Sequence, residues 1–134
     1  MSIKLQTQNI RDIGVFERVT KVHVKDCIRD ESSVYFMIER GKSGLAIGKN
    51  GAVIKSVSKV LGKTVKIFEF ADDVETMVKN MIPTAKGVEV GGDSVTVTIP
   101  NSDRSVVIGR SGRNIKVMKE FLKRHFKINY LRLR

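Results

Sequence analysis

Apolar residues follow helix-type and strand-type spacing along the chain in a fixed order. The first half predicts a helix, two strands with alternating β-branched and aromatic residues, a short helical turn, a longer helix and a third strand. In that order, the elements cover residues 10–20, 22–29, 33–39, a turn ending at Ile47, 52–61 and 64–70. The apolar face of the longer helix is formed by Ile54, Val57 and Leu61, and Gly62 is placed to end that helix.

The second half repeats this succession. Asp72 or Asp73 is placed to cap a helix that runs to Met81, and Pro83 follows its end. The later elements are strands at 88–90 and 95–99 around a Gly91-Gly92 turn, a helix carrying Ile115, Met118 and Leu122, and a last strand over 126–133. The order α-β-β-α-α-β therefore occurs twice. It predicts an α+β fold of two small domains, 1–71 and 72–134, packed closely with almost no linker, because units this small are marginal alone.

A glycine motif marks the repeat. Ile47-Gly48-Lys49-Asn50-Gly51 returns 61 positions later as Ile108-Gly109-Arg110-Ser111-Gly112. Between residues 33 and 67, eleven of 35 columns are identical at this offset, and the last two identities are Lys66 and Ile67. Average residue usage predicts about two identities by chance. The two halves are therefore copies of one unit.

Positive charge is concentrated in the same parts of both copies. The chain has a net charge of +11 and a pI of about 10.0. Residues 40–66 carry +7 with no acidic residue and residues 104–134 carry +9, whereas the rest of the chain carries −5. This excess favours a polyanionic partner, either nucleic acid or an anionic membrane surface. The sequence shows neither a signal peptide nor an apolar stretch long enough to span a membrane, so we expect a cytoplasmic protein.

The glycine loops are suited to bind phosphate. Two glycines separated by two residues allow a tight, exposed turn between two helices, and the next helix points free N–H groups and its positive dipole end at that turn. Lys49 and Arg110 add a cation at the tip of each loop. Lys55 and Lys116 lie one helical turn further on and point away from the apolar stripe. A tight turn without a ligand is the alternative, but such a turn needs no cation at its tip.

Signals for enzymatic chemistry are weak. Gly41-Lys42-Ser43 looks like the end of a P-loop, but Phe36 occupies the position where that motif needs glycine. His23 and His125 lack cysteine or carboxylate partners at metal-ligand spacing. The single cysteine, Cys27, excludes a disulfide within the chain and is expected to be a small buried residue. We therefore expect no catalytic residue, metal or cofactor.

The loops, in this element order, resemble the KH domain in its prokaryotic, type II form. That resemblance implies a loop that clamps the backbone of about four nucleotides of single-stranded RNA. Two such domains in a chain this short and basic resemble the archaeal NusA-type transcription termination and elongation factors. The bacterial members also contain a polymerase-binding domain and an OB-fold domain, and we expect neither from the residues of this sequence.

What the resemblance implies is a monomer that holds nascent RNA with both loops, with RNA polymerase or its elongation complex as a further partner. The implied RNA-binding residues are Gly48, Lys49, Asn50, Gly51, Lys55, Gly109, Arg110, Ser111, Gly112, Arg113 and Lys116. Ile47 and Ile108 either line the nucleotide groove or belong to the core. Two alternatives stay open: a ribosome-associated or RNA-processing KH protein, and a binder of single-stranded DNA.

Overall fold

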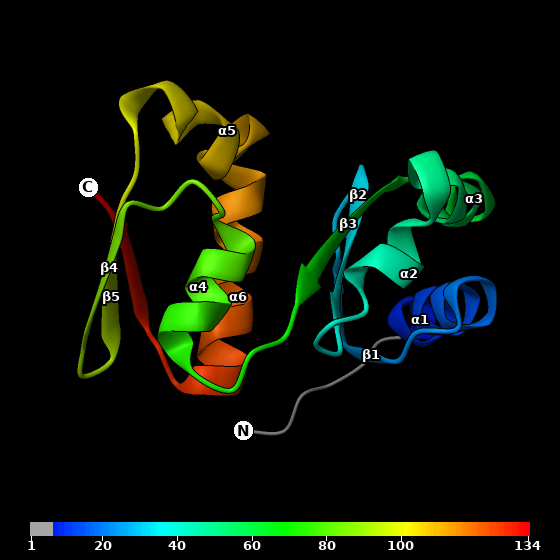
Figure 1. Cartoon of the computed structure of the whole chain (residues 1–134), viewed down its shortest axis with the longest axis horizontal. Coiled ribbons are helices and arrows are strands. Elements are labelled where there is room, and N and C mark those ends of the chain that lie inside the picture. Colours follow the sequence, from blue (N-terminus) through cyan, green and yellow to red (C-terminus); the bar gives the residue numbers. More distant parts are fainter. Residues whose placement is uncertain (1–6) are drawn as a thin grey trace. The chain divides into compact units, whose positions relative to one another are not determined.

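The chain forms two compact units that divide between Phe70 and Ala71 in a computed structural model, which describes residues 7–134. The first unit follows the order predicted for it (Figure 1). Its elements are α1 (Thr7–Thr20), β1 (Val24–Arg29), β2 (Ser33–Ile38), α2 (Ser43–Ile47), the 3-10 turn η1 (Lys49–Gly51), α3 (Ala52–Leu61) and β3 (Thr64–Glu69). The succession of helices and strands that the spacing of apolar residues predicted for this half is therefore confirmed.

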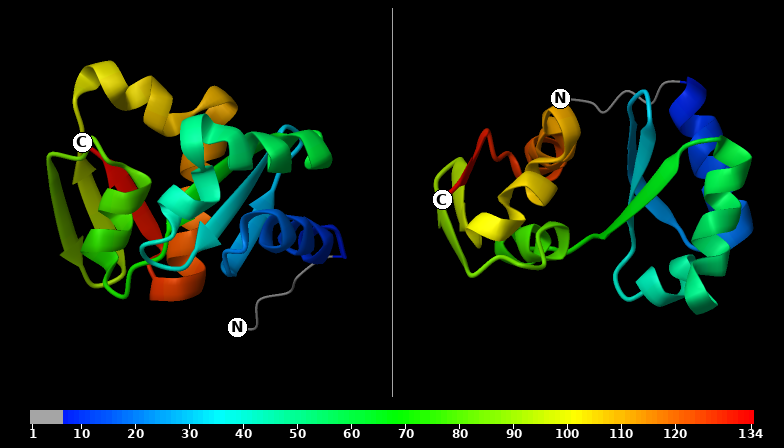
Figure 2. Two further views of the ribbon diagram at one scale, coloured as in Figure 1. Left: turned by 45° about the vertical axis from the view of Figure 1, so that its right-hand side comes forward. Right: turned by 90° about the horizontal axis from the view of Figure 1, so that it is seen from above.

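The sheet of the first unit has β2 in the middle, antiparallel to β1 and parallel to β3. The helices of the unit lie on one face of this sheet (Figure 2). Val34, Phe36 and Ile38 belong to the buried core between the sheet and these helices. Phe16 from α1 stacks on Phe36 with ring centroids 4.3 Å apart. This apolar core is the main source of stability for the unit that carries the first glycine loop.

The second unit repeats the order and the sheet topology of the first. Its elements are α4 (Val74–Met81), β4 (Gly87–Gly91), β5 (Ser94–Thr98), η2 (Asn101–Asp103), α5 (Arg104–Ile108), η3 (Arg110–Gly112), α6 (Arg113–Phe126) and β6 (Tyr130–Leu133). The middle strand β5 is antiparallel to β4 and parallel to β6. Asp73 caps α4 as predicted, since its Oδ2 accepts a hydrogen bond of 2.9 Å from the N–H of Thr76.

The last helix corrects the sequence analysis. A strand was expected over 126–133, but α6 continues to Phe126 and β6 begins only at Tyr130. Gly62 ends α3 in a left-handed conformation, whereas Lys123, at the aligned position, is a good helix former. The helix therefore runs another turn and ends at Lys127, which adopts φ 57°.

This longer helix breaks the gapless alignment of the two copies. Ser33 pairs with Thr64 in the first sheet, and its counterpart Ser94 pairs with Tyr130 in the second. The identities at Lys66 and Ile67 are therefore not structurally equivalent to Lys127 and Ile128. The hairpin turn is also displaced by one residue from the prediction, because Gly91 still pairs with Ser94 and the turn contains Gly92 and Asp93.

The single cysteine is a core residue, as expected. Cys27 is 2% exposed and belongs to the apolar core of the first unit. Burial raises the pKa of its thiol to about 12, so the thiolate needed for nucleophilic chemistry is scarce at neutral pH. Across residues 7–134, no helix is long and apolar enough to cross a membrane.

Candidate nucleic-acid interface

The two glycine loops have the same backbone geometry. Gly48 has φ 78° and ψ 173°, and Gly109 has φ 80° and ψ 170°. Asn50 and Ser111 are both left-handed, with φ 55° and 57° and ψ 26° in each case. Each loop is closed by a hydrogen bond of 3.1 Å from the N–H of its second glycine to the carbonyl of its first. The repeat therefore preserves a shape as well as a sequence.

The first glycine of each loop is required for two reasons. Its φ and ψ lie in a region that essentially only glycine adopts. A Cβ at Gly48 would also lie 2.4 Å from Cγ2 and 3.0 Å from the backbone nitrogen of Val53. A Cβ at Gly109 would lie 2.9 Å from the backbone nitrogen of Asn114. The loop therefore packs directly against the first turn of the following helix.

Neither of these first helical turns has a side-chain cap. The N-caps of α3 and α6 are Gly51 and Gly112, so neither helix start has a side-chain cap hydrogen bond, and neither has an acidic residue in its first turn. By contrast, α4 is capped by Asp73 and carries Glu75 in its first turn. The N–H of the first residue of each helix, Ala52 or Arg113, donates to the carbonyl of Lys49 or Arg110 within the turn. The later N–H groups of the first turn and the positive dipole end are the features that bind phosphate at helix starts.

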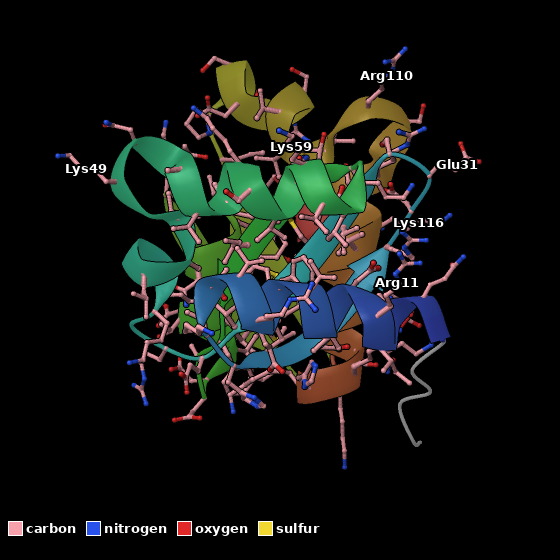
Figure 3. All side chains as sticks on the ribbon, turned by 90° about the vertical axis from the view of Figure 1, so that its right-hand side faces the viewer. Arg11, Glu31, Lys49, Lys59, Arg110 and Lys116 are labelled. Atoms are coloured by element: carbon pink, nitrogen blue, oxygen red, sulfur yellow. The ribbon has the colours of Figure 1, made fainter. Side chains whose placement is uncertain are left out.

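Exposed cations lie on or near both glycine loops. Lys49 and Arg110 are exposed, and both side chains project outward from their loops in Figure 3. Lys55 is exposed, and its Cε lies 3.7 Å from where a Cβ on Gly51 would be, so its stem lies beside the first loop. Lys116 occupies the matching position on α6 and is also exposed.

The second loop has one more cation in its immediate surroundings. Arg113 begins α6 and is half-buried, whereas Ala52 holds the equivalent position at the start of α3. The basic face of α3 continues to Lys59, but the matching residue of α6 is Glu120, which pairs with Arg124 at 3.3 Å. The two sites therefore share a geometry and differ in how charge is distributed around it.

A carboxylate anchors the segment that leads into the first loop. Oε1 of Glu69, the last residue of β3, accepts a hydrogen bond of 2.6 Å from the N–H of Gly41. Hydrogen bonds from Ser43 and from Gly41 hold the pKa of Glu69 below its usual range. The ionised carboxylate ties the start of α2 to the sheet, and no local sequence signal indicated this contact.

Exposed apolar side chains lie next to both loops, and two of them, Leu45 and Val106, were missed by the sequence analysis. Leu45 on α2 is 55% exposed, and Val106, at the equivalent position on α5, is 72% exposed. Ile47 is 41% exposed, which places it on the surface, whereas Ile108 is half-buried. The shared apolar character of positions 45 and 106 was the available signal. These side chains offer apolar surface beside a cationic loop.

Metal-ligand chemistry finds no support in the described part of the chain. Residues 7–134 contain no group of three or more His, Cys, Asp or Glu side chains that could hold a metal ion. His23 lies on the surface with Nδ1 3.1 Å from Oε2 of Glu17. The site as described therefore consists of two tight turns, each with an exposed lysine or arginine.

The family of the chain is shown by comparing its sequence with known protein families. Residues 10–80, more than half of the chain, match the KH domain family, so the chain is a KH-domain protein. The match includes the first glycine loop and all of the first unit from Ile10 onward.

The relatives identify the family more closely. The probable transcription termination protein NusA of Methanocaldococcus jannaschii is 32% identical, over 98% of this chain and 75% of that protein. The protein of the same name from Halobacterium salinarum is 33% identical over 99% of both chains. Among solved structures, the chain in the crystal structure of APE1850 is 30% identical in sequence to this chain. The two superpose with a TM-score of 0.78, over 97% of this chain and 100% of the APE1850 chain. The chain belongs to the archaeal NusA family.

Proposed function

We propose that this protein binds single-stranded RNA through its two glycine loops and acts in the control of transcription termination and elongation. The observation that carries the proposal is the same glycine turn, built twice before a helix start without a side-chain cap, with an exposed lysine or arginine in each turn. The transcriptional part rests on similarity to archaeal proteins named probable transcription termination protein NusA. A monomeric state and a cytoplasmic location belong to the same proposal.

We also propose that both units are type II KH domains, comprising residues 1–71 and 72–134. The support for the second domain is its sheet, with β5 in the middle and the same strand directions as in the first. Its loop angles match those of the first loop within a few degrees, as given above.

In the proposed binding mode, backbone phosphates of RNA occupy the two turns. N–H groups at the starts of α3 and α6 face the phosphates, and Lys49 and Arg110 neutralise them. Bases then lie against the exposed apolar side chains of Leu45, Ile47 and Val106. Only residues 70–73 separate β3 from α4, so occupation of one loop raises the effective RNA concentration at the other.

Binding is expected to weaken steeply with salt. Each phosphate neutralised on a single strand contributes about −0.7 to the slope of log affinity against log salt. If Lys49, Lys55, Arg110, Arg113 and Lys116 each neutralise one phosphate, the slope is about −3.5. Fluorescence anisotropy with labelled RNA, over a salt series, measures it. A slope near zero would contradict electrostatic binding, and competition with DNA of the same sequence at one salt concentration tests the preference for RNA.

The transcriptional role predicts the proteins found with this one in cells. We expect a tagged chain to co-purify with RNA polymerase and with nascent transcripts, after RNA cross-linking and nuclease treatment. Recovery of ribosomal subunits in place of polymerase would instead favour the alternative, a ribosome-associated KH protein. The control is the variant with aspartate at Lys49, Asn50, Arg110 and Ser111, which should lose the transcripts if the loops hold them.

A further inference from the structure

The sheet of the second unit has one face that its helices leave uncovered. Val95 and Val97 of β5 are buried on the side of α4 and α6, so the alternate residues Ser94, Thr96 and Thr98 point to the other side. Figure 1 shows α4 and α6 on one side of this sheet. We call the face that carries Ser94, Thr96 and Thr98 the outer face.

An aromatic ring and two arginines lie along one edge of the outer face. Strand β6 pairs Tyr130 with Ser94 and Arg132 with Thr96, and its alternation places Tyr130, Arg132 and Arg134 together on this face. Tyr130 is 56% exposed, although a tyrosine ring is costly to leave in water. The backbone N–H groups of Asn129 and Tyr130 both donate to the carbonyl of Asp93, at 2.8 and 3.2 Å, which positions the start of the strand.

The rest of the outer face is flat and polar. Gly87, Glu89 and Gly91 of β4 pair with Thr98, Thr96 and Ser94, so the face holds glycines, small hydroxyl side chains and one carboxylate. That carboxylate, on Glu89, lies 3.8 Å from Nη1 of Arg134 and is thereby partly neutralised. Arg132 lies two residues from Tyr130, about 7 Å along the strand.

The copied sheet in the first unit has a different character on the same face. There the residues equivalent to Thr96 and Thr98 are Tyr35 and Met37, and both are completely buried. The residues equivalent to Tyr130, Arg132 and Arg134 are Thr64, Lys66 and Phe68, so a cation is present in both copies but the exposed tyrosine is not. The same sheet topology therefore forms without an exposed tyrosine at this position, so Tyr130 is not required by the fold.

We infer that the outer face is a second RNA-contact surface, on which one base stacks on Tyr130 and an adjacent phosphate pairs with Arg132. The inference rests on the proposed RNA-binding function and extends it to a sheet face outside the glycine loops. An exposed aromatic ring on a flat sheet is a platform on which any base can stack, and a neighbouring arginine supplies the charge that the RNA backbone needs. A protein partner fits less well, because interface cores need several large apolar side chains and this face has one aromatic ring.

The test compares substitutions in the full chain by anisotropy with a fluorescein-labelled oligouridine of about 20 nucleotides, longer than two loops of about four nucleotides each require. Tyr130→Ser is expected to weaken binding about tenfold, whereas Tyr130→Phe keeps the ring and stays within about twofold. Arg132→Gln should weaken binding and reduce the magnitude of the salt slope by about 0.7. The matched control is Val90→Ser, which removes another exposed apolar side chain from the opposite face of the same sheet and should leave the affinity unchanged.

The results distinguish failure of the outer-face inference from failure of RNA binding by the loops. If aspartates in both loops abolish binding while Tyr130→Ser binds within twofold of the natural chain, the outer face does not bind RNA and is left as a solvated or protein-binding surface. If those loop aspartates leave binding unchanged, the proposed function itself fails. An equal loss in Tyr130→Phe would overturn stacking. Should Tyr130→Ser fail to fold, photo-cross-linking of the natural chain to 4-thiouridine RNA decides: adducts at Tyr130 support the inference, and adducts confined to the loops overturn it.

Discussion

Aspartate at Lys49, Asn50, Arg110 and Ser111 together is expected to lower RNA affinity at least a hundredfold and to leave the fold intact. The four changes remove two cations and place four carboxylates where the phosphates are proposed to lie. Loss of two charge-assisted contacts costs about 3–6 kcal/mol, which is a factor of about a hundred or more, before any repulsion is added. Anisotropy with labelled RNA measures the affinity, and circular dichroism measures the fold.

The backbone of the loops explains why folding should survive. Asn50 and Ser111 are left-handed, a conformation that aspartate tolerates better than most residues, and all four side chains are exposed. Variants of one loop should bind with intermediate affinity, because the other loop is intact.

The chain contains a charge-matched control for these variants. Lys79-Asn80 near the end of α4 has the same residue types as Lys49-Asn50, so Lys79→Asp with Asn80→Asp makes the same charge change outside the loops. This control should lose only the small, general part of the electrostatic attraction. An equal loss in the control and in the first-loop variant would show that net charge, and not the loop, determines binding.

The largest stability effect is expected at the first glycine of each loop. Gly48→Ala should destabilise the first unit by about 2–6 kcal/mol, since a backbone conformation that essentially only glycine adopts costs about 1–3 and overpacking about 1–3. Gly51→Ala should cost only about 1–2 kcal/mol, because its conformation is left-handed but its nearest neighbour, Cε of Lys55, would lie 3.7 Å from the new Cβ. Urea denaturation of the full chain, followed by circular dichroism, gives both values.

The second loop provides an independent repeat of this comparison. A Cβ at Gly109 would lie 2.8–2.9 Å from three atoms of Asn114, whereas a Cβ at Gly112 would lie 3.9 Å from its nearest neighbour, Cγ2 of Ile115. The same order of stabilities is therefore expected. Equal destabilisation by the first and second glycine of a loop would contradict the close approach of loop and helix.

The element order and both loops could be predicted because their causes are local. The glycines, the helical stripe at Ile54, Val57 and Leu61, the stop at Gly62 and the cap at Asp73 each depend on residues within about one or two helical turns. The repeat then allowed each copy to check the other. The repeat also led to the wrong start for the last strand, because the identities at Lys66 and Ile67 suggested a gapless alignment although α6 is longer than α3.

Parts of the candidate site could not be predicted, since they depend on contacts between distant residues. The hydrogen bond from Gly41 to Glu69 spans 28 positions, and no local pattern indicates it. The exposure of Leu45 and Val106 depends on how α2 and α5 pack, because an apolar residue in a short helix is a core residue by default.

By itself, the sequence determined a basic, duplicated α+β protein whose two Gly-x-x-Gly loops, at Gly48 and Gly109, precede a helix, because glycine conformation, periodicity and charge act over short stretches of chain. The tertiary structure alone decided that β2 and β5 lie in the middle of their sheets, that Val53 and Asn114 press against the loops, and that Tyr130 lies exposed while Tyr35 is buried. Those outcomes follow from strand pairing and packing between distant segments, whose free energy is gained only when the whole unit closes.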